Sequence, residues 1–188
     1  MRIVSGTARG RRIEAPPGTE TRPTLDRVRE NLFNMLQAEV PEAQVLDLFA
    51  GSGALSLEAL SRGARKAVLA DHSRAAFQCQ RANIRTLGFE DRAESLLMEW
   101  QRAVSLLCGR GDRFDLVFLD PPYRMMDLRD EMNAILPLLA DRALVIAEHE
   151  ARKPVLVPAF FYAEKQRSWG FCGVTIYRLT ADSRDGNP

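Results

Sequence analysis

Two short motifs in this sequence hold residues that could carry out chemistry. The first is Asp120-Pro121-Pro122-Tyr123, which follows the apolar run 114–119, a run typical of a buried strand. Proline has no N–H to donate, so the carbonyls of this motif and the carboxylate of Asp120 form a patch of acceptors. An exocyclic amine could donate its hydrogens to that patch while Tyr123 stacks on the ring. The motif therefore predicts a site that orients a planar base for methylation of its amine nitrogen.

The second motif is the stretch 47–53, DLFAGSG, in which Asp47 ends a predicted strand and Gly51 and Gly53 lead into a predicted helix. Glycines let a backbone approach a ligand closely, and a helix N-terminus offers free N–H groups. Asp71 follows Gly51 by 20 residues, at the end of the next predicted strand. A carboxylate at that place can accept both hydroxyls of a ribose. The motif therefore predicts a site for a nucleoside cofactor.

A nicotinamide dinucleotide is the competing ligand for such a glycine loop. The third glycine of G-x-G-x-x-G would fall at Ser56, so the pyrophosphate fingerprint is incomplete. Asp47 would repel a pyrophosphate but attract an ammonium group. S-adenosylmethionine carries an α-amino group, a ribose and no phosphate, so the pattern favours this cofactor. A glycine-rich turn without any ligand is the remaining alternative, and the spacing of Asp71 argues against it.

The elements that must position these motifs alternate between strands and helices. Strands are expected at 44–49, 67–70, 92–97, 114–119 and 143–147, and helices at 54–61, 74–86, 100–107 and 128–139. Such alternation predicts an α/β, Rossmann-like fold, a mostly parallel sheet with helices on both faces. Two more strands, 155–157 and 174–179, would complete seven and add antiparallel pairing at one edge. Because ligands lie beyond the carboxyl ends of parallel strands, Asp47, Asp71 and Asp120 should face one crevice.

The 188 residues are expected to form a single domain. An N-terminal extension over 1–38 should hold a small hairpin within 2–14 and then a helix that Thr24 caps. The catalytic α/β core is expected over 43–180. The polar end, 181–188, should be frayed.

The N-terminal extension is basic although the whole protein is nearly neutral. Residues 1–37 hold seven arginines and four acids, a local charge of +3. A basic segment on a neutral protein predicts contact with a polyanion, and a solvated surface is the equal alternative. The best candidates for phosphate contacts are Arg9, Arg11 and Arg12.

Composition bears on location and on metals. No apolar run is long enough to span a bilayer, and the first residues lack the apolar core of a signal peptide, so a cytoplasmic protein is expected. Cys79, Cys108 and Cys172 are odd in number and widely spaced, which favours free thiols over disulfides or a zinc site. With only two histidines, no metal site is expected.

Three segments resemble one family: 21–34 (TRPTLDRVRENLFN), 45–64 (VLDLFAGSGALSLEALSRGA) and 114–123. They are similar to the RsmD-type bacterial rRNA guanine-N2 methyltransferases, within the class I fold that uses S-adenosylmethionine. The last two segments recur in many methyltransferases, and the first is far more specific to this family. The resemblance implies a monomer that methylates the exocyclic N2 amine of one guanine in 16S rRNA, on an assembled or nearly assembled 30S subunit.

The resemblance also implies roles for individual residues. Cofactor contacts would come from Asp47, Phe49, Gly51, Gly53, Asp71 and His72. Methyl transfer would take place at Asp120, Pro121, Pro122 and Tyr123. The segment that holds Arg22, Thr24, Arg27 and Asn34 would flank the base pocket. These four residues, together with Arg9, Arg11 and Arg12, which are chosen for their charge, would meet the substrate RNA.

One pair of residues departs from the family pattern. After the third strand the family usually has Gly-Asp, whose Asp accepts the adenine amino group, and here the pair is Met98-Glu99. Glu99 can accept the same hydrogen bond with one more methylene of reach. We therefore predict that Glu99 binds the adenine.

Three other functions are compatible with parts of the sequence. A DNA adenine-N6 methyltransferase shares the logic of the Asp120 motif, but this chain has no room for a separate DNA-reading domain. Enzymes that methylate a glutamine side chain usually carry Asn at the place of Asp120. A catalytically silent, S-adenosylmethionine-binding assembly factor of the ribosome would not need the motif intact.

Overall fold

The alternation of strands and helices continues without a break from residue 44 to residue 150. The computed structural model describes residues 1–16, 23–121, 127–153 and 155–180, apart from the side chains of 23–25. Its strands are β1 Gln44–Asp47, β2 Lys66–Asp71, β3 Ala93–Leu97, β4 Phe114–Leu119, β5 Leu139–Glu150, β6 Phe161–Trp169 and β7 Cys172–Leu179. Its helices are α1 Pro23–Met35, α2 Ala54–Ser61, α3 Arg74–Leu87, α4 Trp100–Arg110, α5 Arg129–Ala134 and the 3₁₀ turn η1 Leu136–Leu138.

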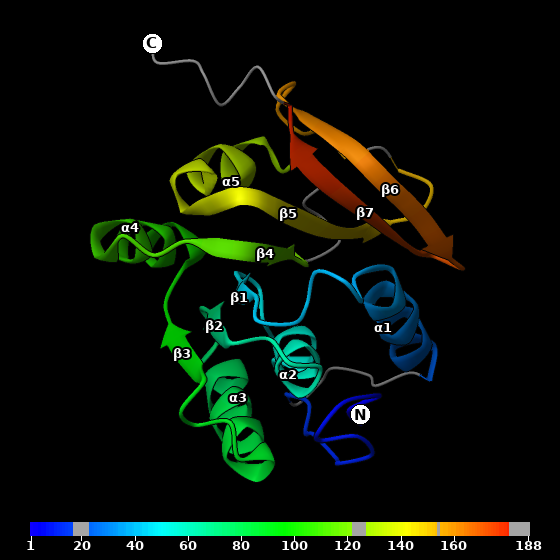
Figure 1. Ribbon diagram of the computed structural model, residues 1–188, viewed down its shortest axis with the longest axis vertical. Coiled ribbons are helices and arrows are strands. Elements are labelled where there is room, and N and C mark those ends of the chain that lie inside the picture. Colours follow the sequence, from blue (N-terminus) through cyan, green and yellow to red (C-terminus); the bar gives the residue numbers. More distant parts are fainter. Residues whose placement is uncertain (17–22, 122–126, 154, 181–188) are drawn as a thin grey trace.

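The strands form one seven-stranded sheet in the order β3-β2-β1-β4-β5-β7-β6 (Figure 1). Strands β1 to β5 are parallel, and β7 runs antiparallel to both β5 and β6. The central strands β1 and β4 are almost completely buried because helices cover both of their faces. The predicted Rossmann-like class is confirmed, including its antiparallel edge.

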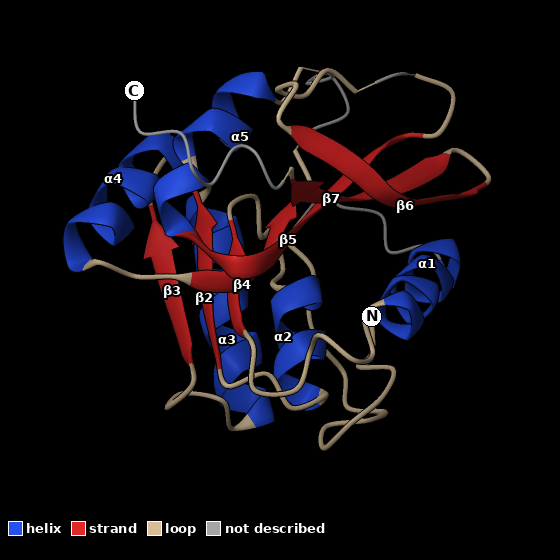
Figure 2. Ribbon diagram, turned by 45° about the horizontal axis from the view of Figure 1, so that its top comes forward, coloured by secondary structure: helices blue, strands red, loops and turns tan. Residues whose placement is uncertain are grey.

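Helices α1, α2 and α3 cover one face of the sheet, and α4 and α5 cover the other (Figure 2). On the first face the ring of Phe33 in α1 lies 6.0 Å from the ring of Phe118 in β4. On the second face Leu107 and Met132 pack against the apolar side chains of β4 and β5. The helix α1, which precedes the alternation, is thereby held over the central strands.

Two predicted elements are wrong. The helix expected at 128–139 ends at Ala134, and β5 already begins at Leu139, because Pro137 has no N–H to continue the α-helical hydrogen bonds. The strand expected at 155–157 is a single bridge between Leu156 and Asp127. The true edge strand is β6, whose side chains face mostly solvent and therefore lack an apolar alternation.

The N-terminal segment folds back on helix α2. Arg2 and Arg12 form an antiparallel bridge, which agrees with the expected hairpin. The buried carboxylate of Glu58 in α2 accepts hydrogen bonds from the backbone N–H groups of Val4 (2.8 Å) and Ser5 (3.0 Å). These contacts fix the segment beside the glycine loop that precedes α2.

Gly6 makes the closest approach between this segment and α2. Its φ is +83°, and a Cβ at this position would lie 1.8 Å from the carbonyl oxygen of Ser61. The Ser61 hydroxyl also accepts the N–H of Ala8 at 3.0 Å. No side chain therefore fits at residue 6.

Among the helices of the described residues, none is long and apolar enough to cross a membrane.

Candidate active site

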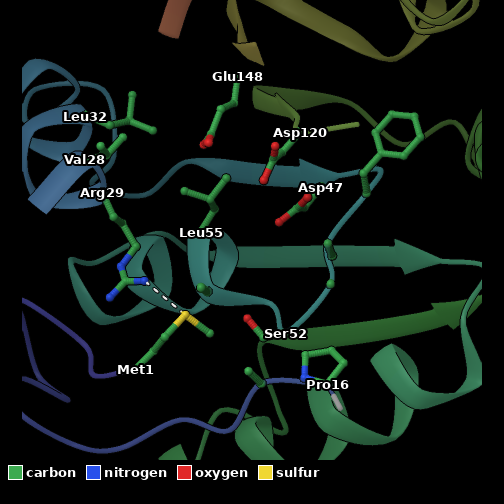
Figure 3. A pocket seen from close by; sticks show the side chains of 15 residues that line it. Met1, Pro16, Val28, Arg29, Leu32, Asp47, Ser52, Leu55, Asp120 and Glu148 are labelled. Carbon is green, nitrogen blue, oxygen red and sulfur yellow. Dashed lines mark hydrogen bonds between the residues drawn. The ribbon is translucent and has the colours of Figure 1, made fainter. Parts of the chain in front are cut away.

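A cavity of about 220 Å³ opens at the carboxyl ends of the central strands (Figure 3). Its polar wall is formed by Asp47 of β1, Asp120 after β4 and Glu148 of β5. Its apolar wall comes from the helices on one face of the sheet and includes Val28, Leu32 and Leu55. Residues from the N-terminal segment and from the loop after β1 close the remaining side.

The sheet register brings the three carboxyl groups together. Asp47 pairs with Phe118, and Asp120 comes two residues after Phe118, just past the end of β4, on the same face. Leu119 pairs with Ala147, so Asp120 and Glu148 occupy neighbouring positions on adjacent strands. Figure 3 shows all three carboxyl groups directed toward the same space. The predicted meeting of Asp47 and Asp120 is thus seen in the structure, and Glu148 joins them.

The carboxyl group of Asp47 is buried and only half satisfied. Its Oδ2 accepts the Ser56 hydroxyl at 3.1 Å, while Oδ1 has no hydrogen-bond partner. Burial, opposed by the Ser56 hydrogen bond and assisted by the charge of Asp71, raises the pKa of Asp47 to about 7. Asp47 Oδ1 is thus a buried acceptor in the cavity wall that a cationic ligand could bind. The ammonium group of an amino acid would satisfy Oδ1 and favour the ionised form.

Asp120 is buried beside two other acids. Burial first, and then the negative charges of Glu148 and Asp47, raise the pKa of Asp120 well above its ordinary value. This shift favours the protonated form of the Asp120 carboxyl group. Pro121 is buried next to it, whereas Pro122 and Tyr123 lie outside the described residues.

The glycine loop approaches the cavity through conformations that suit glycine. Gly51 has φ of +51°, and nothing lies within 4 Å of a Cβ built there. Its N–H donates to Asp71 Oδ2 at 2.9 Å. Gly53 has φ of +81°, and its Cβ would lie 2.7 Å from Leu69 Cδ2. The loop is therefore open on the ligand side at Gly51 and tightly packed on the sheet side at Gly53.

Two side chains of α3 hold the loop carbonyls, and the sequence analysis missed both. Gln80 Nε2 donates to the Gly51 carbonyl at 3.2 Å, and Asn83 Nδ2 donates to the Ser52 carbonyl at 2.9 Å. Asn83 also exchanges hydrogen bonds with the backbone of Glu14 (2.8 and 3.0 Å), so it ties the N-terminal segment to the loop. The available signal was the occurrence of amides at 80 and 83, on the buried face of an amphipathic helix.

Comparisons with known proteins show to which family the chain belongs. A family model described as "Conserved hypothetical protein 95" matches residues 1–178. The chain belongs to this family. The resemblance drawn from the sequence is confirmed by a relative from Escherichia coli (strain K12) named "Ribosomal RNA small subunit methyltransferase D". That relative is 39% identical over 184 residues, with 96% of this chain and 91% of the relative covered.

Two solved structures extend the comparison. The Escherichia coli protein yhhF is 39% identical with a TM-score of 0.81, covering 96% of this chain and 98% of its own. The structure of SMU.776 in complex with SAH is 14% identical with a TM-score of 0.70, covering 85% of this chain and 50% of its own. At that identity the second likeness concerns the fold alone.

In this member of the conserved hypothetical protein 95 family, five parallel strands each bring an acid to the same sheet edge. In spatial order from β3 to β5 these acids are Glu99, Asp71, Asp47, Asp120 and Glu148. Both oxygens of Asp71 accept backbone N–H groups, from Gly51 (2.9 Å) and Ser73 (2.8 Å). The cavity wall includes Asp47 and Asp120 but not Asp71 or Glu99.

The remaining predicted cofactor residues lie near this edge. Phe49 and Gly51 line the cavity, and Gly53 is buried behind it. His72 is 66% exposed, with its Nδ1 3.8 Å from Asp71 Oδ1. Glu99 is exposed at the N-cap of α4, so its adenine contact remains a prediction.

The predicted RNA contacts form two groups. Arg9, Arg12, Arg27 and Asn34 are exposed. Arg11 donates to the carbonyl of Leu87 at 3.0 Å and to that of Thr86, so its guanidinium also caps the end of α3. Arg22 and the side chain of Thr24 lie outside the described residues. All of these contacts remain predictions.

Arg29 and Glu148 are cavity residues that the sequence analysis did not select. Arg29 is buried and pairs with Asp26 (3.0 Å) and Glu58 (3.7 Å), and its Nη1 reaches the sulfur of Met1 at 3.9 Å (Figure 3). In the sequence, Arg29 is one of the seven arginines that make the N-terminal extension basic, and no local pattern indicates that it is buried. Glu148 has no motif around it, and only the pairing of β5 with β4 places it at the site.

Proposed function

We propose that this chain transfers a methyl group from S-adenosylmethionine to the exocyclic N2 amine of one guanine in 16S rRNA. Its substrate in this proposal is the assembled or nearly assembled 30S subunit. The observation that carries the proposal is the shared cavity, in which the unsatisfied Asp47 lies beside Asp120 at the carboxyl edge of the sheet. An ammonium-binding carboxylate next to an amine-binding carboxylate is what transfer from this cofactor to an amine requires.

The cofactor half of the site is formed by chain segments that the structure already orders. Asp47 Oδ1 would accept the α-ammonium group, and Asp71 would accept the ribose hydroxyls while Gly51 N–H keeps its carboxylate in place. Gly51 leaves room for the ligand because no side chain projects from it. S-adenosylmethionine supplies an electrophilic methyl group on its sulfonium.

The base half of the site would orient the amine. Asp120 accepts one N2 hydrogen, which turns the nitrogen lone pair toward the methyl group. As the new N–C bond forms, the nitrogen becomes cationic and Asp120 takes its proton, while the sulfonium becomes a neutral thioether. Pro121, Pro122 and Tyr123 would fix and stack the base, as their motif predicts.

The choice of RNA rests on the names of relatives and on the exposed cations. The Escherichia coli relative that is 39% identical is named as a methyltransferase of small-subunit ribosomal RNA. Three arginines are exposed at the surface, where phosphate groups could reach them: Arg9, Arg12 and Arg27. In this proposal the protein works as a cytoplasmic monomer.

The N-terminal extension, 1–38, would act as part of one domain with the core, 43–180. Its segment is hydrogen-bonded to α2 through Glu58, and its helix contributes Val28 and Leu32 to the cavity. In this arrangement the extension forms one wall of the base site as well as a contact surface for RNA.

The direct test is methyl transfer from labelled S-adenosylmethionine to unmethylated small ribosomal subunits, followed by mass analysis of the nucleosides. We expect N2-methylguanosine with the wild type and with Asp130→Ala, a change at an exposed acid of α5, but none with Asp120→Ala. Absence of label on subunits with the wild type would overturn the proposal. Label on DNA adenine instead would point to the DNA-modifying alternative.

A further inference from the structure

The second carboxyl group of the base half, that of Glu148, has no role in the transfer described above. Asp120 directly follows Leu119, Glu148 directly follows Ala147, and these two preceding residues are paired across β4 and β5. Neighbouring strands lie about 4.8 Å apart, so two carboxyl groups stand side by side at the cavity wall. Figure 3 shows both of them directed into the cavity, above Leu55.

The surroundings of Glu148 orient it toward a ligand. From the sheet, the Cys172 thiol donates to Glu148 Oε1 at 3.2 Å. On the opposite side of the cavity lie Val28 and Leu32 of α1, which offer apolar surface to the flat face of a ring. The buried cation of the cavity, Arg29, is paired with Asp26 and Glu58. Two adjacent acceptors therefore face an apolar slot.

Among the bases, the Watson–Crick edge of guanine matches two adjacent acceptors. Guanine carries N1–H next to the N2 amine, so it presents two donors in a row. Adenine carries an acceptor, N1, next to its amine. 2,6-Diaminopurine keeps the N2 amine of guanine but also has an acceptor at N1. A base whose ring nitrogen is an acceptor would set a lone pair against the second carboxylate, and a buried polar mismatch of this kind is costly.

We propose that Glu148 is a specificity-determining residue that accepts the N1–H of guanine, while Asp120 accepts a hydrogen of the neighbouring N2 amine. This inference rests on the proposed function and deepens it, because it names the group that distinguishes guanine from other amine-bearing purines. Burial and, after it, the charge of Glu148 raise the pKa of Asp120, so a donor from the base would relieve the repulsion between the two groups. Guanine has one donor for each carboxyl group, N1–H for Glu148 and the N2 amine for Asp120.

The test compares two substrates that differ only at the ring nitrogen. Small subunits are assembled with semisynthetic RNA that carries either guanine or 2,6-diaminopurine at the methylated position, and kcat/KM for methyl transfer is measured on each. We expect the wild type to prefer guanine by about 100-fold or more. In Glu148→Gln the preference should fall below about tenfold, because the amide can donate to an N1 acceptor.

The matched control is Glu150→Gln. Glu150 lies two residues further along β5, pairs with Lys153 at 2.6 Å and is not part of the cavity wall. This variant removes the same charge from the same strand and should keep the wild-type preference. Binding of S-adenosylhomocysteine, measured by calorimetry, should be unchanged in both variants because neither residue is in the cofactor half.

The outcomes separate this inference from the function on which it rests. A wild type that methylates neither substrate overturns both. A wild type that methylates guanine at N2, with a preference that Glu148→Gln leaves unchanged, overturns the role of Glu148 alone. If the glutamine variant does not fold, Glu148→Asp replaces it. The shorter acid should lower kcat/KM on guanine while the preference over diaminopurine persists, and loss of that preference would contradict the proposal.

Discussion

The two halves of the cavity are stabilised in different ways. In the cofactor half, the glycine loop is held by hydrogen bonds within the protein, from Gln80, Asn83 and the carboxylate of Asp71. In the base half, Asp120 and Glu148 stand side by side, and their charges oppose each other. The cofactor half is thus held by contacts within the protein, whereas the base half brings two acids together at the cavity wall.

The two halves also differ in how far apart their residues lie in the chain. The cofactor loop and the acid before it lie within 47–53, and the ribose acid follows at 71. The base half combines α1 with the ends of β4 and β5, which are far apart in the chain. Changes in one half should therefore leave the other half working, and the following predictions test that independence.

The largest effect is expected from Asp120→Asn. The amide cannot take the proton from the methylated nitrogen, so kcat for methyl transfer should fall by about 10³-fold. Binding of S-adenosylhomocysteine should change by less than about threefold, since Asp120 belongs to the base half. Calorimetry and single-turnover transfer measure the two quantities separately. A parallel loss of cofactor affinity would show that the halves are not independent.

Gly53→Ala should disturb the cofactor half by destabilising the folded protein. The new Cβ would lie 2.7 Å from Leu69 Cδ2 at a φ of +81°. We expect the free energy of unfolding in urea to fall by about 2–4 kcal/mol, from crowding and left-handed strain together. Gly111→Ala is the matched control, because its φ is +71° and its Cβ would meet nothing within 4 Å. If the two variants lost equal stability, crowding at Leu69 would play no part.

Asn83→Ala should loosen the cofactor half without unfolding it. The change removes the hydrogen bonds to Ser52 and Glu14, and we expect it to lower the free energy of unfolding by about 2 kcal/mol. The Kd of S-adenosylhomocysteine should rise by about tenfold as the loop loses order. Gln78→Ala, on the exposed face of the same helix, should change neither quantity. An unaltered Kd in Asn83→Ala would mean that the loop does not depend on α3.

The last effect concerns the pH dependence of cofactor binding at Asp47. In the cofactor-free protein the pKa of Asp47 is about 7, above its ordinary value, so the folded state holds this proton below pH 7. An ammonium ligand needs the carboxylate, so affinity for S-adenosylhomocysteine should rise from pH 5.5 to 7, by at most about tenfold per pH unit. Binding should release a proton, which calorimetry in buffers of different ionisation enthalpy detects. Asp47→Asn should bind weakly at every pH in this range, and a steep slope in that variant would assign the proton to another group.

The sequence predicted the parts of the site whose geometry follows from strand ends. Asp47, Asp71 and Asp120 were expected in one crevice because all three end apolar runs of a parallel sheet. The register and the cavity wall bring Asp47 and Asp120 together, whereas Asp71 is not part of that wall. Glu148 was not expected, since its place depends on which strand lies next to β4, and no local pattern states that. Asn83 looked like an ordinary helical amide, because its partners Ser52 and Glu14 are distant in sequence.

The features that were not predicted correctly from the sequence are those whose structure depends on tertiary contacts. Strand β6 is polar along most of its length and is ordered by pairing with β7, so its sequence carries little strand signal. Arg11 was chosen for its charge, but the structure also gives it carbonyl partners at the end of α3, which only the fold could bring near.

The five acids along the sheet edge shape how an RNA strand can arrive. Under the proposed function, a phosphate group that approached this edge would be repelled by those of the five acids that are ionised, whereas a neutral base would not. A nucleotide would then enter with its base leading and with its phosphates outside, toward the exposed arginines of the N-terminal segment. Added salt weakens the attraction at the arginines and the repulsion at the acids at the same time. In this proposal the edge would select the orientation of the incoming nucleotide before any hydrogen bond has formed.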